Sequence, residues 1–272
     1  MRVGVVQLNV GDDPAANLIQ TLALLDRAEG ADLVLTPECI NLLSSNRDHQ
    51  RAVLRHQAED PTLAALRNWA ARCGVHLLIG SLGLLTHDAD GRFANRSFLI
   101  GPAGEIIAQY DKIHMFDVNV SDSEVYRESA AYRPGSQAVV APTPWGGLGM
   151  TVCYDLRFAY LHRMLAQRGA DILTVPAAFN HITGAAHWEV LLRARAIETG
   201  CFVIAPAQTG FHAETAGKGR RTYGHSLVVS PWGEVILDMG TDMGLGQVDL
   251  DLSQVAQARA RIPALHHDRE VT

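Results

Sequence analysis

Paired cysteines are the first feature that the sequence lacks. Its four cysteines, Cys39, Cys73, Cys153 and Cys201, lie far apart in the 272 residues, and no CxxC motif occurs. Neither a disulfide framework nor a zinc ribbon is therefore indicated. Each cysteine has to be considered by itself.

Basic excess and long apolar runs are also absent. The chain has 23 Lys and Arg against 29 Asp and Glu, a formal net charge of -6, which argues against a nucleic-acid or anionic-membrane partner. No apolar stretch approaches the roughly 20 residues that span a bilayer. The short apolar run at the N-terminus is bounded by a glycine and two aspartates, unlike a signal peptide. We therefore expect a cytoplasmic protein without a membrane partner.

Several well-known active-site motifs are missing as well. The sequence has no GxGxxG, GxxxxGK[ST], GxSxG or HExxH pattern. Nucleotide-binding, serine-hydrolase and zinc-protease functions therefore lack support, and we expect no metal site.

What the sequence does contain is an alternation of strand and helix patterns. Apolar runs at 3–8, 33–35 and 76–81 alternate with helical patterns that begin at Pro14 and cover 62–72. The second half repeats this pattern, with helices expected at about 156–168 and 184–199. Continuous apolar strands are typical of sheets covered on both faces. The chain is therefore of the α/β class.

Two segments resemble each other and break the alternation. Residues 97–109 and 226–238 each read as strand, Gly/Pro turn with Gly-Glu, and strand, so each predicts a β-hairpin. The pair indicates two stacked sheets with helices outside, a four-layer α-β-β-α sandwich. No linker divides the chain, so we expect a single domain over 1–272, in which 261–272 form a polar tail at a subunit interface.

Three apolar strands end in residues that can do chemistry, namely Glu38, Lys112 and Cys153. Reactive groups in α/β proteins gather outside the carboxyl ends of strands, so the three could converge. A helix starting after Cys153 would favour its thiolate. Lys112 would supply a fixed positive charge, and Glu38 would be a general base whose pKa burial raises and Lys112 restrains. Taken alone, Cys153 is better explained as a packing residue and Lys112 as a solvated one.

The segments TPE at 36–38, YDKIHMFD at 110–117 and GMTVCYDLRF at 149–158 resemble the Glu-Lys-Cys signature of the nitrilase superfamily of carbon-nitrogen hydrolases. Residues 127–135, 186–208 and 223–234 extend the resemblance over essentially the whole chain. The resemblance implies the α-β-β-α sandwich, a homodimer or larger homo-oligomer, and amide hydrolysis without a metal or organic cofactor.

The resemblance also implies roles for individual residues. Cys153 would attack the amide carbonyl, Lys112 would stabilise the oxyanion, and Glu38 would pass protons to the leaving ammonia and from water. Glu128 would orient Lys112 and the substrate, and the backbone N–H of Tyr154 would share the oxyanion site. A thioester would form and then be hydrolysed.

The substrate is less sharply indicated. Residues 182–202, 206–210 and 220–229 most resemble the branch that hydrolyses deaminated glutathione, and the omega-amidases that act on α-ketoglutaramate and α-ketosuccinamate are the close alternative. A non-catalytic binding or scaffold protein on the same fold is an alternative of another class.

Substrate contacts are expected from three places. Arg157 could anchor a substrate carboxylate or brace its helix by an acidic partner. A pocket wall is expected from Phe179, Asn180, Thr183, His187 and Glu189. The polar loop 212–221 could cover the site or supply a cation from Lys218, Arg220 or Arg221.

Other polar and thiol side chains are interpreted as structural. These are His114, the helical charge network Arg193, Arg195 and Glu198, and the packing cysteines Cys39, Cys73 and Cys201.

Overall fold

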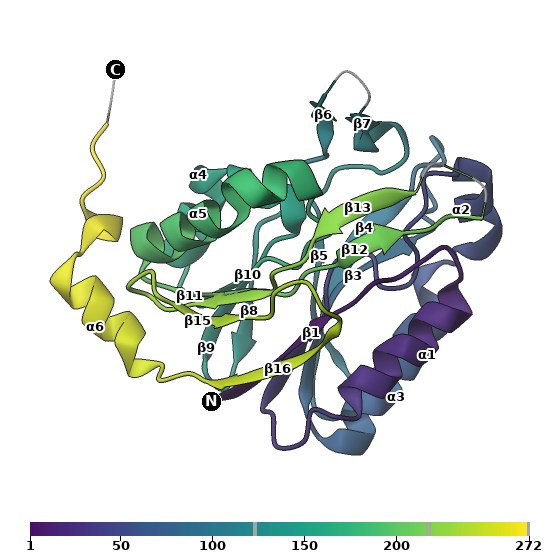
Figure 1. Ribbon diagram of the computed structural model, residues 1–272. Coiled ribbons are helices and arrows are strands. Elements are labelled where there is room, and N and C mark those ends of the chain that lie inside the picture. Colours follow the sequence, from purple (N-terminus) through teal and green to yellow (C-terminus); the bar gives the residue numbers. More distant parts are fainter. Residues whose placement is uncertain (122–123, 216, 218, 271–272) are drawn as a thin grey trace.

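Two stacked β-sheets with helices on their outer faces form the fold. The computed structural model describes residues 1–121, 124–215, 217 and 219–270. In Figure 1, α1 and α3 lie on one side of the paired sheets, and α4 and α5 lie on the other. The predicted four-layer α-β-β-α sandwich is confirmed.

Each sheet has six strands and mixes parallel with antiparallel neighbours. The first has the order β16 (Gly244–Asp249), β1 (Arg2–Gln7), β2 (Leu33–Leu35), β3 (His76–Leu84), β4 (Ala94–Ile100) and β5 (Ile106–Asp111). The second has the order β15 (Val235–Asp238), β14 (Leu227–Val229), β11 (Phe202–Ala205), β10 (Ala170–Thr174), β9 (Gly146–Met150) and β8 (Val139–Thr143).

Helices connect and cover these strands. The α-helices are α1 (Pro14–Leu25), α2 (Arg47–Val53), α3 (Pro61–Cys73), α4 (Ala159–Gln167), α5 (His181–Thr199) and α6 (Ser253–Arg261). Short 3₁₀ turns are η1 (Gln57–Glu59), η2 (Glu128–Ala130), η3 (Cys153–Arg157) and η4 (Ala264–His266).

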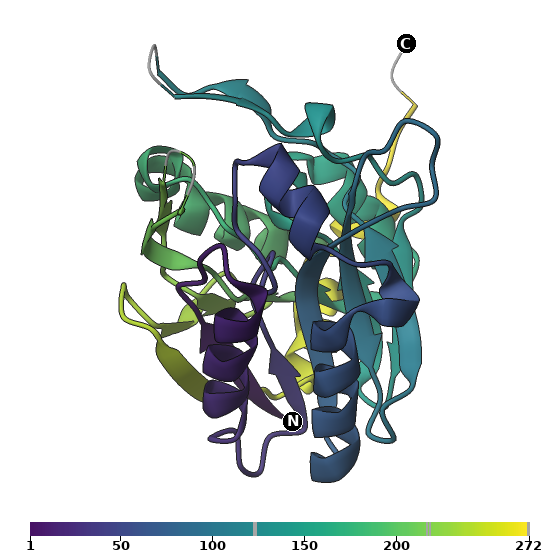
Figure 2. The ribbon, with the colours of Figure 1, turned by 90° about the vertical axis from the view of Figure 1, so that its right-hand side faces the viewer.

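Two small antiparallel ribbons stand apart from the main sheets. One pairs β6 (Asp117–Asn119) with β7 (Val125–Arg127), and the other pairs β12 (Thr209–His212) with β13 (Arg220–Tyr223). Figure 2 shows the first ribbon projecting from the body of the molecule. Both ribbons contribute residues to the cavity described below.

Both predicted hairpins are present, and they share a detail. The strands β4 and β5 pair antiparallel with a register shift at Leu99/Ile100, and β14 and β15 pair antiparallel with one at Val228/Val229. Such a bulge increases the local twist of a strand pair. The two similar sequences therefore fold into the same irregular hairpin, one in each sheet.

Helix boundaries follow from local caps. Asp13 accepts a hydrogen bond from Ala15 N, 2.9 Å away, and Pro14 occupies the first turn of α1. Asn180 accepts from Ile182 N at 2.9 Å, and this cap starts α5 at His181 instead of the expected 184. The helix expected from 156 is instead the turn η3 followed by α4, which begins at Ala159.

Apolar side chains fill the space between the sheets and beneath the helices. One cluster joins both sheets to α4 and α5, and a second packs α1 and α3 on the first sheet. Cys201 and Cys39 are buried, as expected for packing residues, but Cys73 is exposed at the end of α3, so its assignment to packing is wrong.

The C-terminal tail packs on its own chain. Gln167 of α4 donates to Leu265 O at 3.0 Å and to Asp268 Oδ2 at 2.7 Å, and Arg163 forms an ion pair with Asp268. Leu265 is buried by this contact. The tail thus covers part of α4.

Buried His162 makes stability depend on pH. Its Nδ1 lies 3.2 Å from Phe158 O, while Nε2 is buried without a hydrogen-bond partner in the described residues. Burial, helped by the Arg195 charge, lowers the pKa of His162 to about 4 from the usual 6.5. A proton at Nε2 would have no acceptor, so the folded state resists protonation.

We expect this histidine to weaken the fold in acid. Between pH 6.5 and 4 the unfolded chain binds a proton that the folded chain does not, so stability falls as pH falls, by about 3 kcal/mol in total from this group. Urea unfolding of wild type and His162→Gln at several pH values measures this: the variant should lose less stability on acidification. Parallel pH curves for the two proteins would contradict the expectation.

Candidate active site

Glu38 is held by an unusually close approach of two strands. It follows the end of β2, and a Cβ on Gly80 of β3 would lie 2.1 Å from Thr36 O and 2.4 Å from Pro37 O. Only glycine leaves room there. The following residue, Cys39, has φ 56° and donates from its N–H to Ser81 Oγ at 2.9 Å. The backbone on both sides of Glu38 is therefore fixed against β3.

Lys112 directly follows β5, and carboxylates surround its ammonium. Its backbone N–H donates to Asn95 O at 3.0 Å, which continues the pairing of β5 with β4. Nζ lies 3.0 Å from Glu38 Oε1 and 2.9 and 2.8 Å from the two oxygens of Glu128. Lys112 is only 2% exposed, so its interpretation as a solvated lysine is wrong.

Cys153 begins the turn η3 immediately after β9 and Val152. Its N–H donates to Pro176 O at 2.9 Å, and its φ of 51° lies in the left-handed region. A non-glycine residue in this region carries strain, and such residues concentrate at functional sites. Cys153 is 7% exposed, and its thiol lies close enough to Glu38 for the two groups to shift each other's pKa.

The glutamate, the lysine and the cysteine therefore converge, as their strand-end positions led us to expect. Glu38 lies at the centre: Lys112 donates a hydrogen bond to its carboxylate, and the Cys153 thiol lies close enough to affect its pKa. Its remaining contacts are hydrogen bonds from Ala178 N at 2.8 Å and Asn95 Nδ2 at 2.9 Å. Because its two oxygens accept several hydrogen bonds, the carboxylate is held in one orientation as a strong hydrogen-bond acceptor.

The protonation states differ from the expectation. Burial raises the pKa of Cys153 well above its usual value, and the Glu38 charge raises it further against the opposing effect of Lys112. Burial alone would raise the pKa of Glu38, but Lys112 and the hydrogen bonds from Cys153 and Ala178 lower it overall. The expectations of a thiolate favoured by a helix start and of a glutamate with a raised pKa are both wrong.

Lys112 itself stays charged. Burial would lower the pKa of its ammonium, but the charges of Glu128 and Glu38 raise it well above the usual value. The resting cluster thus contains one cation, two carboxylates and a neutral thiol. Loss of the thiol proton to solvent would add a third negative charge, whereas transfer of that proton to Glu38 leaves the net charge unchanged. The geometry favours a general-base mechanism over a standing thiolate.

A buried carboxylate links the cysteine turn to the lysine loop. Asp155 accepts hydrogen bonds from Val152 N at 2.9 Å, Tyr110 Oη at 2.7 Å and His114 N at 3.0 Å. His114 Nδ1 lies 2.6 Å from the same carboxylate, and its ring stacks on Phe158 with centroids 3.5 Å apart. These contacts agree with a structural role for His114, which holds the segment after Lys112 beside the segment that carries Cys153.

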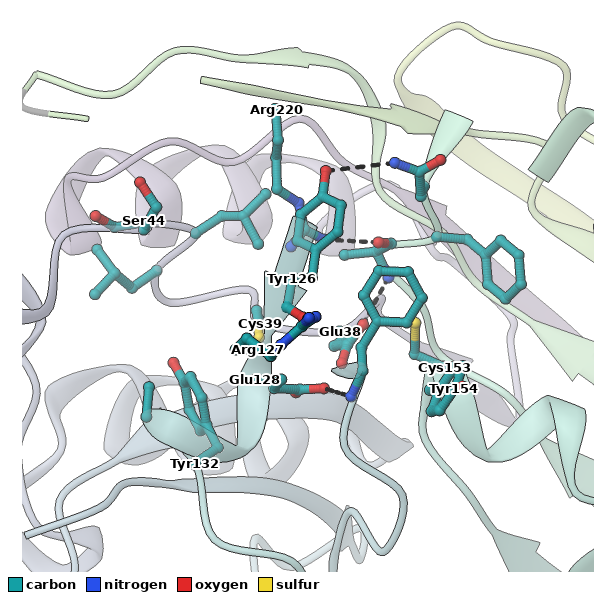
Figure 3. A pocket seen from close by; sticks show the side chains of 18 of the residues that line it. Glu38, Cys39, Ser44, Tyr126, Arg127, Glu128, Tyr132, Cys153, Tyr154 and Arg220 are labelled. Atoms are coloured by element: carbon teal, nitrogen blue, oxygen red, sulfur yellow. Dashed lines mark hydrogen bonds between the residues drawn. The ribbon is translucent and has the colours of Figure 1, made fainter. Parts of the chain in front are cut away.

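A cavity of about 820 Å³ opens above this cluster (Figure 3). Its walls come from the segment before α2, the β6–β7 ribbon, the start of α5 and the β12–β13 ribbon. Asn180 Nδ2 donates to Glu124 Oε2 at 2.8 Å, a contact that connects the start of α5 with the β6–β7 ribbon across the cavity. The cavity is large enough for a drug-sized ligand.

Most expected site residues line this cavity, but four do not. Those that do are Glu38, Lys112, Glu128, Cys153, Tyr154, Phe179 and Asn180. Thr183, His187 and Glu189 lie outside its lining; all three are on α5, and His187 and Glu189 are exposed to solvent. Thr183 Oγ1 is buried without a hydrogen-bond partner in the described part of the chain.

Arg157 also lies outside the lining. Its guanidinium is 5.3 Å from the Phe179 ring centroid and 5.9 Å from that of Tyr154, and its nitrogens lie 3.4 Å from His187 Nδ1. No described acidic residue forms an ion pair with it, so the expected brace by an acidic partner is not found. Arg157 instead supports two aromatic residues of the cavity wall.

The loop 212–221 contributes four residues to the cavity lining, Glu214, Gly219, Arg220 and Arg221. Lys218 lies outside the described residues. Of the expected helical charge network, Arg195 pairs with Glu198 at 2.9 Å, and Arg193 pairs with Glu189 at 3.3 Å.

Sequence reasoning missed Asn95. Its Nδ2 donates to Glu38 Oε1 at 2.9 Å and to Glu128 Oε1 at 3.4 Å, so it links the two carboxylates. The available signal was a buried asparagine near the start of the apolar strand β4. Buried side-chain amides usually form hydrogen bonds, and the Asn95 amide donates to the two carboxylates of this candidate site.

Metal ligands and membrane spans were also sought in the described part of the chain. No group of three or more His, Cys, Asp or Glu side chains there could hold a metal ion. None of its helices is long and apolar enough to cross a membrane.

Comparison with known proteins identifies relatives over nearly the full chain. Residues 2–260 match the family Carbon-nitrogen hydrolase. The deaminated glutathione amidase of Yersinia enterocolitica is 40% identical, over 99% of this chain and 93% of that one. The Omega-amidase NIT2 of Homo sapiens is 33% identical, over 98% of this chain and 95% of that one.

A solved structure gives a further likeness. It is a mutant of the amidase from Nesterenkonia sp. AN1, with the acetamide moiety of fluoroacetamide added covalently at its active site cysteine. The TM-score is 0.78 at 28% identity, with 97% of this chain and 95% of that chain covered.

Proposed function

Because the chain belongs to the carbon-nitrogen hydrolase family and is an amidase, we propose that its substrate is deaminated glutathione. The observation that carries this proposal is the complete Glu38, Lys112, Glu128 and Cys153 cluster at the base of a cavity of about 820 Å³. A scaffold protein would not need a buried lysine between two carboxylates beside a thiol, since such a cluster is costly to bury.

The proposed reaction begins with proton transfer from Cys153 to Glu38. The sulfur attacks the amide carbonyl carbon, and the negative charge that develops on the carbonyl oxygen is stabilised by Lys112 and by the N–H of Tyr154. Glu38 then protonates the nitrogen, the carbon–nitrogen bond breaks, and an amine leaves behind a thioester on Cys153.

Water completes the cycle. It gives a proton to Glu38 and attacks the thioester carbon; the carbon–sulfur bond breaks, and the sulfur takes the proton back from Glu38. In this scheme Glu128 keeps Lys112 aimed at the oxyanion through its two hydrogen bonds, 2.9 and 2.8 Å long. The lowered pKa of Glu38 suits this cycle, since the base must be ionised before each attack.

Cavity size supports the larger of the two candidate substrates. Deaminated glutathione and α-ketoglutaramate share one acyl group, so both would give the same thioester. Their leaving groups differ: α-ketoglutaramate releases ammonia, whereas the corresponding amide nitrogen of deaminated glutathione carries a cysteinylglycine. The expected release of ammonia therefore applies only to the smaller substrate. A cavity of about 820 Å³ leaves ample space for a dipeptide leaving group.

The test is a side-by-side measurement of kcat/KM for the two amides, with release of α-ketoglutarate as the common readout. We expect deaminated glutathione to be preferred by about tenfold or more, because its additional contacts strengthen transition-state binding. A preference for α-ketoglutaramate would assign the chain to the omega-amidase activity, which the human relative's name supports.

Assembly and location complete the proposal. A homodimer or larger homo-oligomer is supported by exposed apolar side chains on α5, among them Val190 and Ile197. A cytoplasmic location is supported by four unpaired cysteines. Light scattering tests the assembly, and a monomer in solution would refute the proposed oligomer. Cell fractionation tests the location, and recovery of the protein outside the cytoplasm would refute a cytoplasmic one.

A further inference from the structure

The catalytic cluster is electrostatically unfavourable for an anionic substrate. Lys112 carries one positive charge, and Glu38 and Glu128 together carry two negative ones, all at the base of the cavity. A substrate carboxylate entering this space is repelled unless another cation faces it. Deaminated glutathione and α-ketoglutaramate both bear carboxylates, so an anchoring cation is needed.

Five lysine and arginine residues line the described part of the cavity. They differ in the groups that already bind their charged ends. Lys112 is occupied by the two glutamates. Arg127 donates to the carbonyls of Val118 and Tyr126 and to Asn119 Oδ1, so its own ribbon holds it. The other three are Arg47 at the start of α2, and Arg220 and Arg221 on β13.

Arg220 is the one of these three that is connected to the catalytic cluster. Its Nη2 donates to Ala178 O at 2.6 Å, and the N–H of the same residue donates to Glu38 Oε2 at 2.8 Å. The positive charge of Arg220 is also close enough to Cys39 to act against the raised pKa of that thiol. Figure 3 shows its side chain pointing into the cavity beside Tyr126.

The guanidinium of Arg220 is not neutralised. No carboxylate of the described residues lies within ion-pair distance of it, and its one hydrogen bond among them is to a backbone carbonyl. The residue is half-buried, so its charge is only partly screened by water. A guanidinium has five N–H donors in a planar fork that matches a carboxylate, and most of these remain available.

We propose that Arg220 binds a carboxylate of the substrate and thereby selects anionic amides. This inference rests on the proposed amidase function and deepens it. Arg157, another cation considered from the sequence, lies against the Phe179 ring and outside the cavity lining. Arg220 instead presents its charge on the cavity side, next to the peptide that holds the general base.

Two nearly isosteric amides test the charge directly. Glutaramate carries a carboxylate at one end, and glutaramide has an uncharged carboxamide in its place. We expect Arg220→Gln to lower kcat/KM for glutaramate by about 10- to 100-fold, mainly through KM, and to change that for glutaramide by less than about threefold. Arg220→Lys should retain part of the preference because it retains the charge.

A matched control removes a charge elsewhere. Arg72→Gln on α3 makes the same change in net charge, and its side chain is 65% exposed and absent from the cavity lining. It should leave both rate constants unchanged. If Arg72→Gln reproduces the loss on glutaramate, the effect is one of net charge and the inference is wrong.

The other outcomes are equally decisive. If Arg220→Gln lowers kcat/KM equally for both amides, Arg220 only positions Ala178 and Glu38. If the variant keeps the wild-type preference for glutaramate, Arg220 binds no carboxylate. Either result overturns the inference. A loss with both α-ketoglutaramate and deaminated glutathione supports binding of the acyl-end carboxylate. A loss with deaminated glutathione alone supports binding of the leaving-group carboxylate.

Glutarate binding separates this inference from the proposed function. Calorimetry should show that Arg220→Gln binds glutarate about tenfold or more weakly than wild type, whichever amide proves to be the substrate. Equal affinities would refute Arg220 as the anchor even if deaminated glutathione is hydrolysed as proposed.

Discussion

Replacing Cys153 with alanine is expected to lower kcat/KM for the preferred amide by at least about 10⁴-fold without unfolding the protein. The thiol is the nucleophile in the proposed reaction, and no other described side chain in contact with Glu38 can form the thioester. Alanine, like cysteine, has a Cβ, so the substitution adds no strain to the left-handed backbone conformation at this position. Steady-state kinetics and a thermal unfolding curve of the same preparation measure both effects.

Cys39 provides a matched control for that experiment. It is also a buried cysteine, also lines the cavity, and also has a left-handed backbone, with φ 56° against 51° for Cys153. Cys39→Ala should retain activity within about threefold, since the thiol has no role in the proposed transfer. Comparable loss in both variants, or substantial activity in Cys153→Ala, would mean that Cys153 is not the nucleophile.

Replacing Lys112 with methionine should abolish turnover and also destabilise the fold. Turnover is expected to fall by about 10³-fold or more, because the oxyanion loses its buried cation. Without that cation, Glu38 and Glu128 lie near each other uncompensated, which typically costs about 3–5 kcal/mol of stability at neutral pH. Urea unfolding and steady-state kinetics measure the two losses.

The stability loss should depend on pH in a defined direction. In wild type, Lys112 contributes to the lowered pKa of Glu38, so stability from this pair is present above the ordinary glutamate pKa and lost in acid. In Lys112→Met the two facing carboxylates share a raised pKa, so the folded state is favoured by protonation. The difference between variant and wild type should therefore shrink below about pH 5.

A second substitution separates stability from catalysis. Lys112→Met/Glu128→Gln removes one of the two facing carboxylates, and the amide keeps the shape of the side chain. This double variant should recover most of the lost stability at pH 7 and still lack activity. If the double variant recovers turnover, Lys112 acts only by neutralising the two carboxylates. Its proposed role in stabilising the oxyanion would then be wrong.

The convergence of the proposed catalytic residues was predictable because each follows an apolar strand. Strand ends in α/β proteins share one edge, so Glu38, Lys112 and Cys153 could be expected together from local patterns alone. The direction of their pKa shifts was not predictable. It depends on how deeply the cluster is buried and on the hydrogen bond from Ala178 N to Glu38, which comes from a distant segment.

The proposed substrate anchor was less accessible to sequence reasoning. Arg157 is four residues from the nucleophile, and nothing local indicates that its side chain turns behind Phe179. Arg220 is far along the chain and reaches the cavity only because β13 pairs with β12 beside α5. The start of α5 at His181 depends on the Asn180 cap, which places Thr183 on the helix instead of in the expected loop.

The raised pKa of Cys153 has a consequence for how the protein meets reactive chemicals. Thiolates attack peroxides and simple alkylating agents, and a neutral buried thiol reacts with them more slowly than a thiolate does. A carbonyl compound bound in the cavity, by contrast, allows the proton to pass to Glu38 as the new bond forms. We therefore expect slow oxidation of the resting enzyme, and we expect its most effective covalent inhibitors to be anionic carbonyl electrophiles that use the proposed proton transfer.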